Sequence, residues 1–164
     1  MPRSPFSARS PQHVVVVGGG PAAHRFAEAV LSAEDHHVRL TVLADEPWLP
    51  YDRVQLTRAL TGDGGGIDLT LGGGTVWQDP RVELRLGVEA REVDPAARTV
   101  TAADGSVVGY DELVLATGSA AARLDVPGAH HAFVFRTLDD AAGIRAEVER
   151  LRALYGRTPR GVVI

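Results

Sequence analysis

The sequence predicts an α/β fold in which a parallel sheet, helices and a small antiparallel β layer form three layers. Three observations support this prediction. Four consecutive valines, Val14 to Val17, are typical of a parallel strand that is buried on both faces. A glycine-rich turn and an amphipathic helix follow this strand directly. Later in the chain, two short segments are joined by Asp104-Gly105, a dipeptide that favours an antiparallel hairpin.

The composition limits the classes of function that the chain can have. It has 164 residues, of which 45% are hydrophobic, and this is enough for a domain with a core. The formal net charge is -4 without a basic block, so nothing favours a nucleic-acid partner. There is no cysteine, which excludes disulfides, thiolate nucleophiles and iron–sulfur ligation by this chain. Redox chemistry would therefore need a bound organic cofactor.

No apolar run approaches the length of a membrane span, so we expect a cytoplasmic protein with no membrane partner. Residues 1–12 are rich in Pro, Ser and Arg and lack the apolar core of a signal peptide, which predicts a flexible tail. We expect one nucleotide-binding domain over 13–156. Residues 157–164 end in an apolar strand, Gly161 to Ile164, with nothing after it to cover both faces. We therefore expect the chain to be truncated at the start of a second domain.

The turn after the valine run fits the pattern Gly-x-Gly-x-x-Gly/Ala, with Gly18, Gly20 and Ala23 in the three small positions. Gly18 permits a tight turn, Gly20 lets a pyrophosphate approach the backbone, and Ala23 lets the helix pack closely on the strand. Pro21 and Ala22 open the helix, whose N-terminus offers free N–H groups and a positive dipole end to phosphates. The motif predicts a Rossmann-like dinucleotide site, although it is weak by itself.

The next elements continue a βαβ unit. Apolar residues at helical spacing from Ala23 to Leu31 predict a helix, and Leu40 to Leu43 predicts the second strand. Asp45 lies at the end of that strand, where an acidic residue accepts hydrogen bonds from a ribose hydroxyl in dinucleotide-binding domains. Glu46 is a second candidate for this role. The alternative interpretation is a solvated Asp-Glu-Pro turn.

Residues 47–62 predict a loop and a short helix in which Arg53 and Arg58 flank an apolar stretch. One interpretation is that these two arginines are ordinary surface charges. The other is that they face a pyrophosphate and an electron-rich cofactor ring. Two glycine triplets, 64–66 and 72–74, predict flexible surface loops rather than phosphate loops, because neither connects a strong strand to a strong helix. Strands are predicted over 82–87, 88–93, 99–102 and 106–108.

A second informative strand ends at Ala116-Thr117-Gly118. Small residues at the carboxyl end of a strand leave space where ligands lie in open α/β sheets, and the alternative is an ordinary exit from a strand. Residues 133–136 predict a short extended run. Thr137 and Asp140 then predict a capping box that opens a long helix, which Gly156 ends.

No catalytic side chain and no metal site are predicted. The six histidines show no partner at metal-ligand spacing. No Gly-x-Ser-x-Gly motif occurs, and no paired carboxylates have a recognisable acid–base setting.

Five segments together resemble a known family: 18–23, 24–26 (His-Arg-Phe), 51–56 (Tyr-Asp-Arg-Val-Gln-Leu), 115–119 and 135–140. In this order they resemble the N-terminal FAD-binding segment of FAD-dependent pyridine nucleotide-disulfide oxidoreductases with the glutathione-reductase-like fold. Segments 24–26 and 51–56 look most similar to the large subunit of NAD(P)H-dependent nitrite reductase. The ferredoxin- and rubredoxin-reductase relatives usually carry Pro-Pro-Leu-Ser-Lys after the arginine.

The resemblance implies roles for individual residues. The glycine turn would cradle the FAD pyrophosphate, Asp45 would hold the adenosine ribose, and Ala90 would contact the adenine through its backbone. Arg53 would lie near the diphosphate, and Arg58 would lie near the flavin. Ala116, Thr117 and Gly118 would close over the dinucleotide, and Arg136 would contact the flavin side.

The resemblance also implies a function. The chain would be the FAD-binding portion of an NAD(P)H-dependent reductase that passes electrons to a downstream redox module or acceptor protein. Residues 157–164 would begin the NAD(P)H-binding domain. Three alternatives remain open: a fragment of a ferredoxin- or rubredoxin-reductase-type flavoprotein, a catalytically inactive nucleotide-binding fragment, and a plain NAD dehydrogenase domain. Residues 120–123 lack the Pro-Arg that is usual in the family, and without cysteine this piece cannot reduce nitrite itself.

Overall fold

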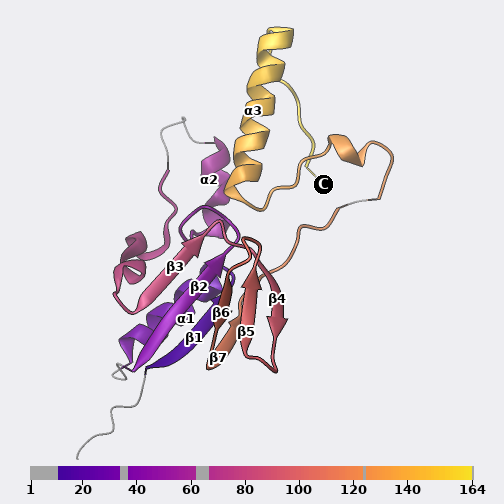
Figure 1. Ribbon diagram of the computed structural model, residues 1–164. Helices are drawn as coiled ribbons and strands as arrows, with labels where there is room; N and C mark the ends of the chain where they lie inside the picture. The colour runs from indigo at the N-terminus through magenta and orange to yellow at the C-terminus, as the bar shows by residue number, and fades with distance from the viewer. Residues whose placement is uncertain (1–10, 34–36, 62–66, 124, 164) are drawn as a thin grey trace, which may run out of the picture. The chain divides into compact units, whose positions relative to one another are not determined.

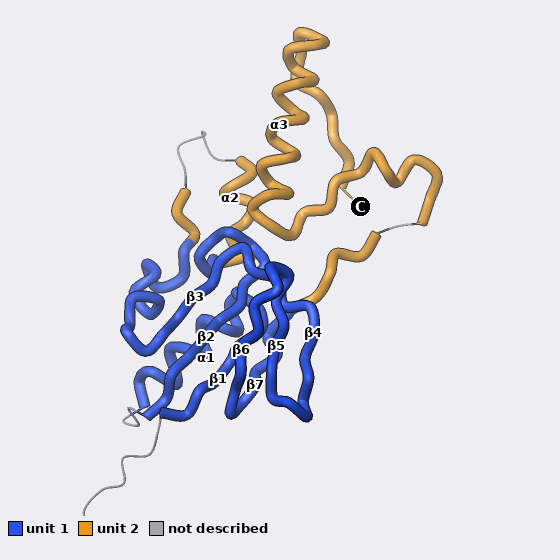
Figure 2. The backbone as a smooth tube through the Cα atoms, in the orientation of Figure 1, with its two compact units in different colours: residues 1–51, 70–118 blue, residues 52–69, 119–164 orange. Residues whose placement is uncertain are grey.

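The computed structural model describes residues 11–33, 37–61, 67–123 and 125–163. The chain divides into two compact units, shown in blue and orange in Figure 2. Unit 1 comprises residues 1–51 and 70–118, and unit 2 comprises residues 52–69 and 119–164. Each unit is built from two segments that are separated in the sequence.

Unit 1 contains a parallel sheet of four strands in the order β3-β2-β1-β7 (Figure 1). The strands are β1 (Gln12–Val17), β2 (Val38–Ala44), β3 (Val82–Leu86) and β7 (Glu112–Leu115). Helix α1 (Pro21–Ser32) connects β1 to β2, and the 3-10 helix η2 (Leu71–Gln78) precedes β3. The predicted βαβ unit is thus present, with β1 at an inner position of the sheet.

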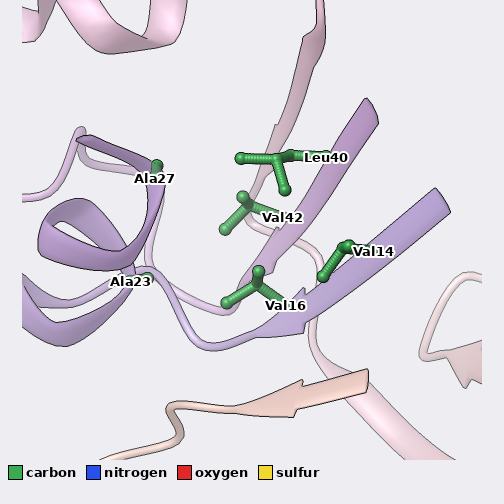
Figure 3. Close-up of a cluster of buried hydrophobic side chains, with 6 residues drawn as sticks. All are labelled: Val14, Val16, Ala23, Ala27, Leu40 and Val42. Atoms are coloured by element: carbon green, nitrogen blue, oxygen red, sulfur yellow. The ribbon is translucent and has the colours of Figure 1, made fainter. Parts of the chain in front are cut away.

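The valines of β1 alternate between the two faces of this sheet. Val14 and Val16 point toward Ala23 and Ala27 of α1, together with side chains of β2 (Figure 3). The other face of the sheet packs against three antiparallel strands in the order β4-β5-β6. These strands are β4 (Ala90–Asp94), β5 (Thr99–Ala102) and β6 (Val107–Gly109). Helix, parallel sheet and antiparallel layer form three layers, which confirms the predicted fold class.

Unit 2 contains η1 (Arg53–Gln55), α2 (Leu56–Thr61), η3 (Ala129–His131) and α3 (Leu138–Tyr155). The predicted capping box opens α3: the Thr137 side chain accepts from the Asp140 N–H, and the Asp140 side chain accepts from the Thr137 N–H. Gly156 ends the helix in a left-handed conformation with φ of 62°. The Arg145 guanidinium donates from Nη1 to the Ala59 carbonyl at 3.3 Å and so connects α3 to α2.

The second glycine triplet differs from its prediction. Gly72, Gly73 and Gly74 have positive φ inside η2, which lies against α1, and Gly74 is buried. This ordered turn replaces the expected flexible loop because consecutive glycines tolerate left-handed dihedrals at low cost. Trp77 of η2 packs against the buried cluster on the α1 face, as expected. The first triplet, 64–66, lies outside the described residues.

The ends of the chain differ from two further predictions. Residues 133–136 and 161–163 carry no strand, and η3 was not predicted. Val162 and Val163 are 88% and 99% exposed, because no described segment pairs with them. At the other end, β1 begins at Gln12, inside the predicted tail of 1–12, of which 1–10 lie outside the described residues. No helix in the described part of the chain combines the length and apolar character of a membrane span.

Candidate functional site

Three predicted site segments lie at one edge of the parallel sheet. The glycine turn follows β1, the acidic pair follows β2, and Ala116-Thr117-Gly118 follows β7. These three strands are parallel neighbours, so their carboxyl ends meet at the same edge. This edge is where open α/β sheets bind ligands.

Gly18 is fixed by the backbone around it. Its φ is +111°, a conformation that side chains rarely adopt. Its N–H donates to the Leu43 carbonyl at 2.8 Å. A Cβ on Gly18 would overlap the Ala116 carbonyl oxygen and would lie 2.6 Å from the carbonyl carbon. The exits of β1 and β7 are therefore packed backbone to backbone, and this contact requires glycine.

Gly20 has a different environment. It is the N-cap of α1 in an extended conformation, and a Cβ placed on it would meet no heavy atom within 4 Å. The space next to the Gly20 Cα at the start of α1 is thus open. Pro21 has no N–H, Ala22 is exposed, and no acidic residue lies in the first turn of α1. The helix start consequently keeps its donors and its positive dipole end available to an anion.

Gly19 is a residue whose role the motif does not reveal. A Cβ on it would overlap the Ala44 Cβ at the end of β2. The only sequence signal is that the three glycines are consecutive, although the pattern leaves the middle position open. Gly19 thus permits close packing between the turn and β2 rather than ligand access.

The two acidic candidates after β2 differ in their surroundings. Asp45 is exposed, whereas Glu46 is half-buried and accepts from the hydroxyl of the buried Tyr51 at 2.7 Å. The Glu46 carbonyl also accepts from the Gly87 N–H. Glu46 therefore has a structural task that the sequence did not indicate, and Asp45 is the better placed of the two to receive a ribose hydroxyl.

The remaining predicted residues of unit 1 occupy two layers. Ala116 packs against the buried cluster on the α1 face, while Thr117 and Gly118 are exposed, with φ of 70° at Gly118. Ala90 begins β4 and packs against the cluster on the other face of the sheet. The structure thus joins Ala116 and Thr117 directly to the glycine turn, and places Ala90 in the antiparallel layer.

The three predicted arginines belong to unit 2. Arg53 Nη1 donates to the Arg136 carbonyl at 3.0 Å, and Arg136 Nη2 donates to Ser119 Oγ at 2.9 Å. Arg58 of α2 is exposed and donates to the Gln55 side chain. Arg53 and Arg136 are therefore in direct contact, and Arg58 is not part of their group. Ser119, which the sequence did not single out, is the partner of the Arg136 guanidinium.

Electrostatics around Arg136 centre on Asp140. Burial raises the pKa of the Asp140 carboxyl, but hydrogen bonds from the Arg136 and Thr137 N–H groups, together with the Arg123 charge, leave this pKa below its usual value. The carboxylate is thus held in its charged form at the start of α3. It stabilises the helix start and the residue before it.

The described residues do not meet the requirements of a metal centre. No group of three or more His, Asp or Glu residues in the described ranges has an arrangement that could hold a metal. An open surface depression of about 950 Å³ lies along α1 and η2, lined by Glu28, Ser32 and Asp79 among others. It extends over the later turns of α1, away from the glycine turn, and contains none of the predicted site residues.

Comparisons with known proteins point to one family. The family model of the pyridine nucleotide-disulphide oxidoreductases matches residues 12–164. The chain is 38% identical over 155 residues to the nitrite reductase [NAD(P)H] large subunit of Klebsiella oxytoca, and the match covers 92% of this chain and 15% of that protein. It is 35% identical over 130 residues to the ferredoxin reductase component of a chlorobenzene dioxygenase from Cupriavidus sp. strain PS12, covering 78% of this chain and 32% of the relative.

Solved structures of reductases have a fold similar to that of this chain. A ferredoxin reductase from Rhodopseudomonas palustris is 31% identical, with a TM-score of 0.74 over 85% of this chain and 35% of that one. The NADH:rubredoxin oxidoreductase from Clostridium acetobutylicum is 25% identical, with a TM-score of 0.71 over 85% of this chain and 36% of that one. The chain thus spans a third or less of the two curated relatives, and slightly more than a third of these structures.

Proposed function

Because this chain belongs to the pyridine nucleotide-disulphide oxidoreductase family, we propose that it is the FAD-binding portion of an NAD(P)H-dependent flavoprotein reductase. The observation that carries the proposal is the glycine turn between β1 and α1, packed on the Ala116 carbonyl with its Gly20 side open. It leaves a helix N-terminus accessible at the carboxyl edge of a parallel sheet.

The described residues of this edge fit a dinucleotide. The open space at Gly20 suits a diphosphate, because a Cβ there would occupy the approach to the backbone. The exposed Asp45 carboxylate suits a ribose diol at the end of β2. Thr117 and Gly118 would cover the dinucleotide from β7, and Ala90 would offer its backbone to the adenine.

Unit 2 would supply the cationic contacts. In this proposal Arg136 faces the flavin side, Arg53 lies toward the diphosphate and Arg58 lies near the flavin. Arginine suits these tasks because its charge persists at every physiological pH and its donors match phosphate oxygens. When bound, FAD would supply the redox chemistry, namely hydride acceptance from NAD(P)H and electron transfer to an acceptor. The chain itself would bind and orient the cofactor, and the proposal needs no acid–base residue among the described side chains.

The domain organisation is part of the proposal. Residues 13–156 form the FAD-binding segment, and residues 157–164 begin a domain that binds NAD(P)H. The downstream acceptor is a redox module or protein. Nitrite-reductase-like electron delivery is favoured by 38% identity to the Klebsiella subunit, and delivery to a ferredoxin or rubredoxin is the alternative suggested by the other relatives.

Ligand binding by the purified 164-residue chain tests the proposal. We expect added FAD to be retained through gel filtration, giving a yellow protein with a raised melting temperature. Saturation with FAD at 100 times its Kd would stabilise the fold by about 2.7 kcal/mol. NAD is added in a parallel sample. Stabilisation by NAD alone would contradict the FAD assignment and favour a plain NAD domain, and binding of neither would favour an inactive fragment.

A further inference from the structure

Arg136 is held by the chain at three separate groups. Its N–H donates to Asp140 Oδ2 at 2.8 Å, its carbonyl accepts from Arg53 Nη1 at 3.0 Å, and its guanidinium donates from Nη2 to Ser119 Oγ at 2.9 Å. A residue that is restrained on its backbone and its side chain has little conformational freedom left to lose when a ligand binds.

The contact with Arg53 joins residues that are 83 positions apart in the sequence. Arg53 opens η1, whose N-cap Asp52 accepts from the Val54 N–H at 2.9 Å and from Gln55 Nε2 at 2.8 Å. These hydrogen bonds, first that of Gln55, hold the pKa of Asp52 below its usual value. Arg53 therefore lies on an ordered turn, η1, and its guanidinium holds the segment that precedes α3.

The contact is also stronger than an ordinary surface hydrogen bond. Its donor is charged, and both Arg53 and Arg136 are half-buried. The Arg136 carbonyl belongs to the peptide that leads into the capping box at Thr137, so Arg53 and Asp140 hold the backbone on the two sides of the Arg136 Cα. Together the two backbone contacts restrain the Arg136 Cα, from which the side chain extends to Ser119.

We propose that Arg53 is a positioning residue for Arg136: its guanidinium fixes the Arg136 peptide so that the Arg136 side chain is presented to the cofactor in its binding orientation. The effect of Arg53 on FAD binding rests on the proposed function, in which Arg136 is the flavin-side contact. The restraint on Arg136 itself is a property of the ligand-free chain. Arg53 thus acts mainly through Arg136 and only secondarily by its own charge.

The first experiment needs no cofactor. We would measure the order parameter of the Arg136 side-chain Nε–H by NMR in the wild-type chain and in Arg53→Gln, Arg53→Lys and Arg145→Gln. Arg145→Gln is the matched control, because it removes another guanidinium-to-carbonyl contact of unit 2 at 3.3 Å. We expect Arg53→Gln to lower the Arg136 order parameter below about 0.6, Arg53→Lys to restore part of it, and Arg145→Gln to leave it unchanged.

The second experiment is a double-mutant cycle on FAD affinity. Arg53→Gln and Arg136→Gln should each raise the FAD Kd about tenfold, and the double variant should be no weaker than Arg136→Gln alone. Arg145→Gln should leave the FAD Kd unchanged. Effects that multiply to about a hundredfold in the double variant would show that Arg53 acts on FAD independently of Arg136 and would overturn the proposal.

The two experiments separate the possible failures. An Arg136 side chain that stays rigid in Arg53→Gln refutes the positioning role, whatever the chain binds. A wild-type chain that binds no FAD refutes the proposed function, while the order parameters still decide whether Arg53 positions Arg136.

Discussion

Two glycines of one turn have opposite structural roles at the scale of single residues. Gly18 has a left-handed φ and a backbone carbonyl where its Cβ would be, so it serves the fold. Gly20 has an extended conformation and empty space at its Cβ position, so nothing in the described fold requires glycine there. Glycine is itself a favourable N-cap residue, so a contact of Gly20 with a ligand belongs to the proposed function and is tested by substitution.

This contrast predicts different behaviour for two alanine variants. Gly18→Ala should lower the free energy of unfolding by about 3 kcal/mol or more, because a strained φ adds to overlap with the Ala116 backbone. Gly20→Ala should cost less than about 1 kcal/mol yet abolish measurable FAD binding. Urea denaturation and FAD fluorescence quenching measure the two effects. Unchanged FAD affinity in a folded Gly20→Ala variant would remove Gly20 from the site.

At the scale of elements, the start of α3 joins helix stability to the site. The carboxylate of Asp140 completes the capping box and also holds the N–H of Arg136. Both hydrogen bonds use the charged form, which is why they, together with Arg123, outweigh the effect of burial and lower the pKa of Asp140. Loss of this charge would weaken the helix start and the Arg136 backbone together.

The pH dependence of this cap follows from the lowered pKa. A group whose pKa is lower in the folded chain stabilises it above its unfolded pKa, about 3.9 for Asp, and this stability is lost as the pH falls through the folded pKa. Asp140→Asn should therefore lower the free energy of unfolding by about 1 kcal/mol at pH 7, with a difference from wild type that shrinks below about pH 4. Urea titrations between pH 7 and 3 test this.

Asp139→Asn is the matched control, since it removes a neighbouring charge from the first turn but leaves the capping box intact. Its effect at pH 7 should be smaller than that of Asp140→Asn, because Asp139 lies in the first turn of α3 but is not part of the capping box. Equal effects of the two variants, or an Asp140→Asn effect that does not change with pH, would mean that the cap is not maintained by the carboxylate charge.

The sequence predicted the elements that have strong local signals. The valine run, the glycine turn, the Asp104-Gly105 hairpin and the Thr137 capping box each specify a conformation within a few residues, and each is found. The turn at Gly72 to Gly74 was missed, because its order comes from packing on α1 and not from local pattern. Contacts such as Arg53 with Arg136 join residues 83 positions apart, so no spacing rule reveals them.

At the scale of the whole molecule, the division into two units was not predicted. The boundaries fall at residues 51–52, 69–70 and 118–119, inside segments that have no marked change in composition. Such a division depends on the density of contacts in space, which a single sequence does not display. It nevertheless sorts the predicted site: the glycine turn, Asp45 and Thr117 belong to unit 1, and the three arginines belong to unit 2.

This sorting predicts that the adenosine diphosphate half of FAD is recognised without Arg136, the proposed flavin-side contact of unit 2. ADP alone should raise the melting temperature of the chain, because the helix start and Asp45 both lie in unit 1. Gly20→Ala should abolish this stabilisation, Asp45→Asn should weaken ADP binding about tenfold through the lost charged acceptor, and Arg136→Gln should leave it unchanged. Thermal melts of the four proteins across a series of ADP concentrations measure this. A loss of ADP binding in Arg136→Gln equal to that in Gly20→Ala would contradict the assignment, because the diphosphate would then depend on unit 2 as much as on the glycine turn.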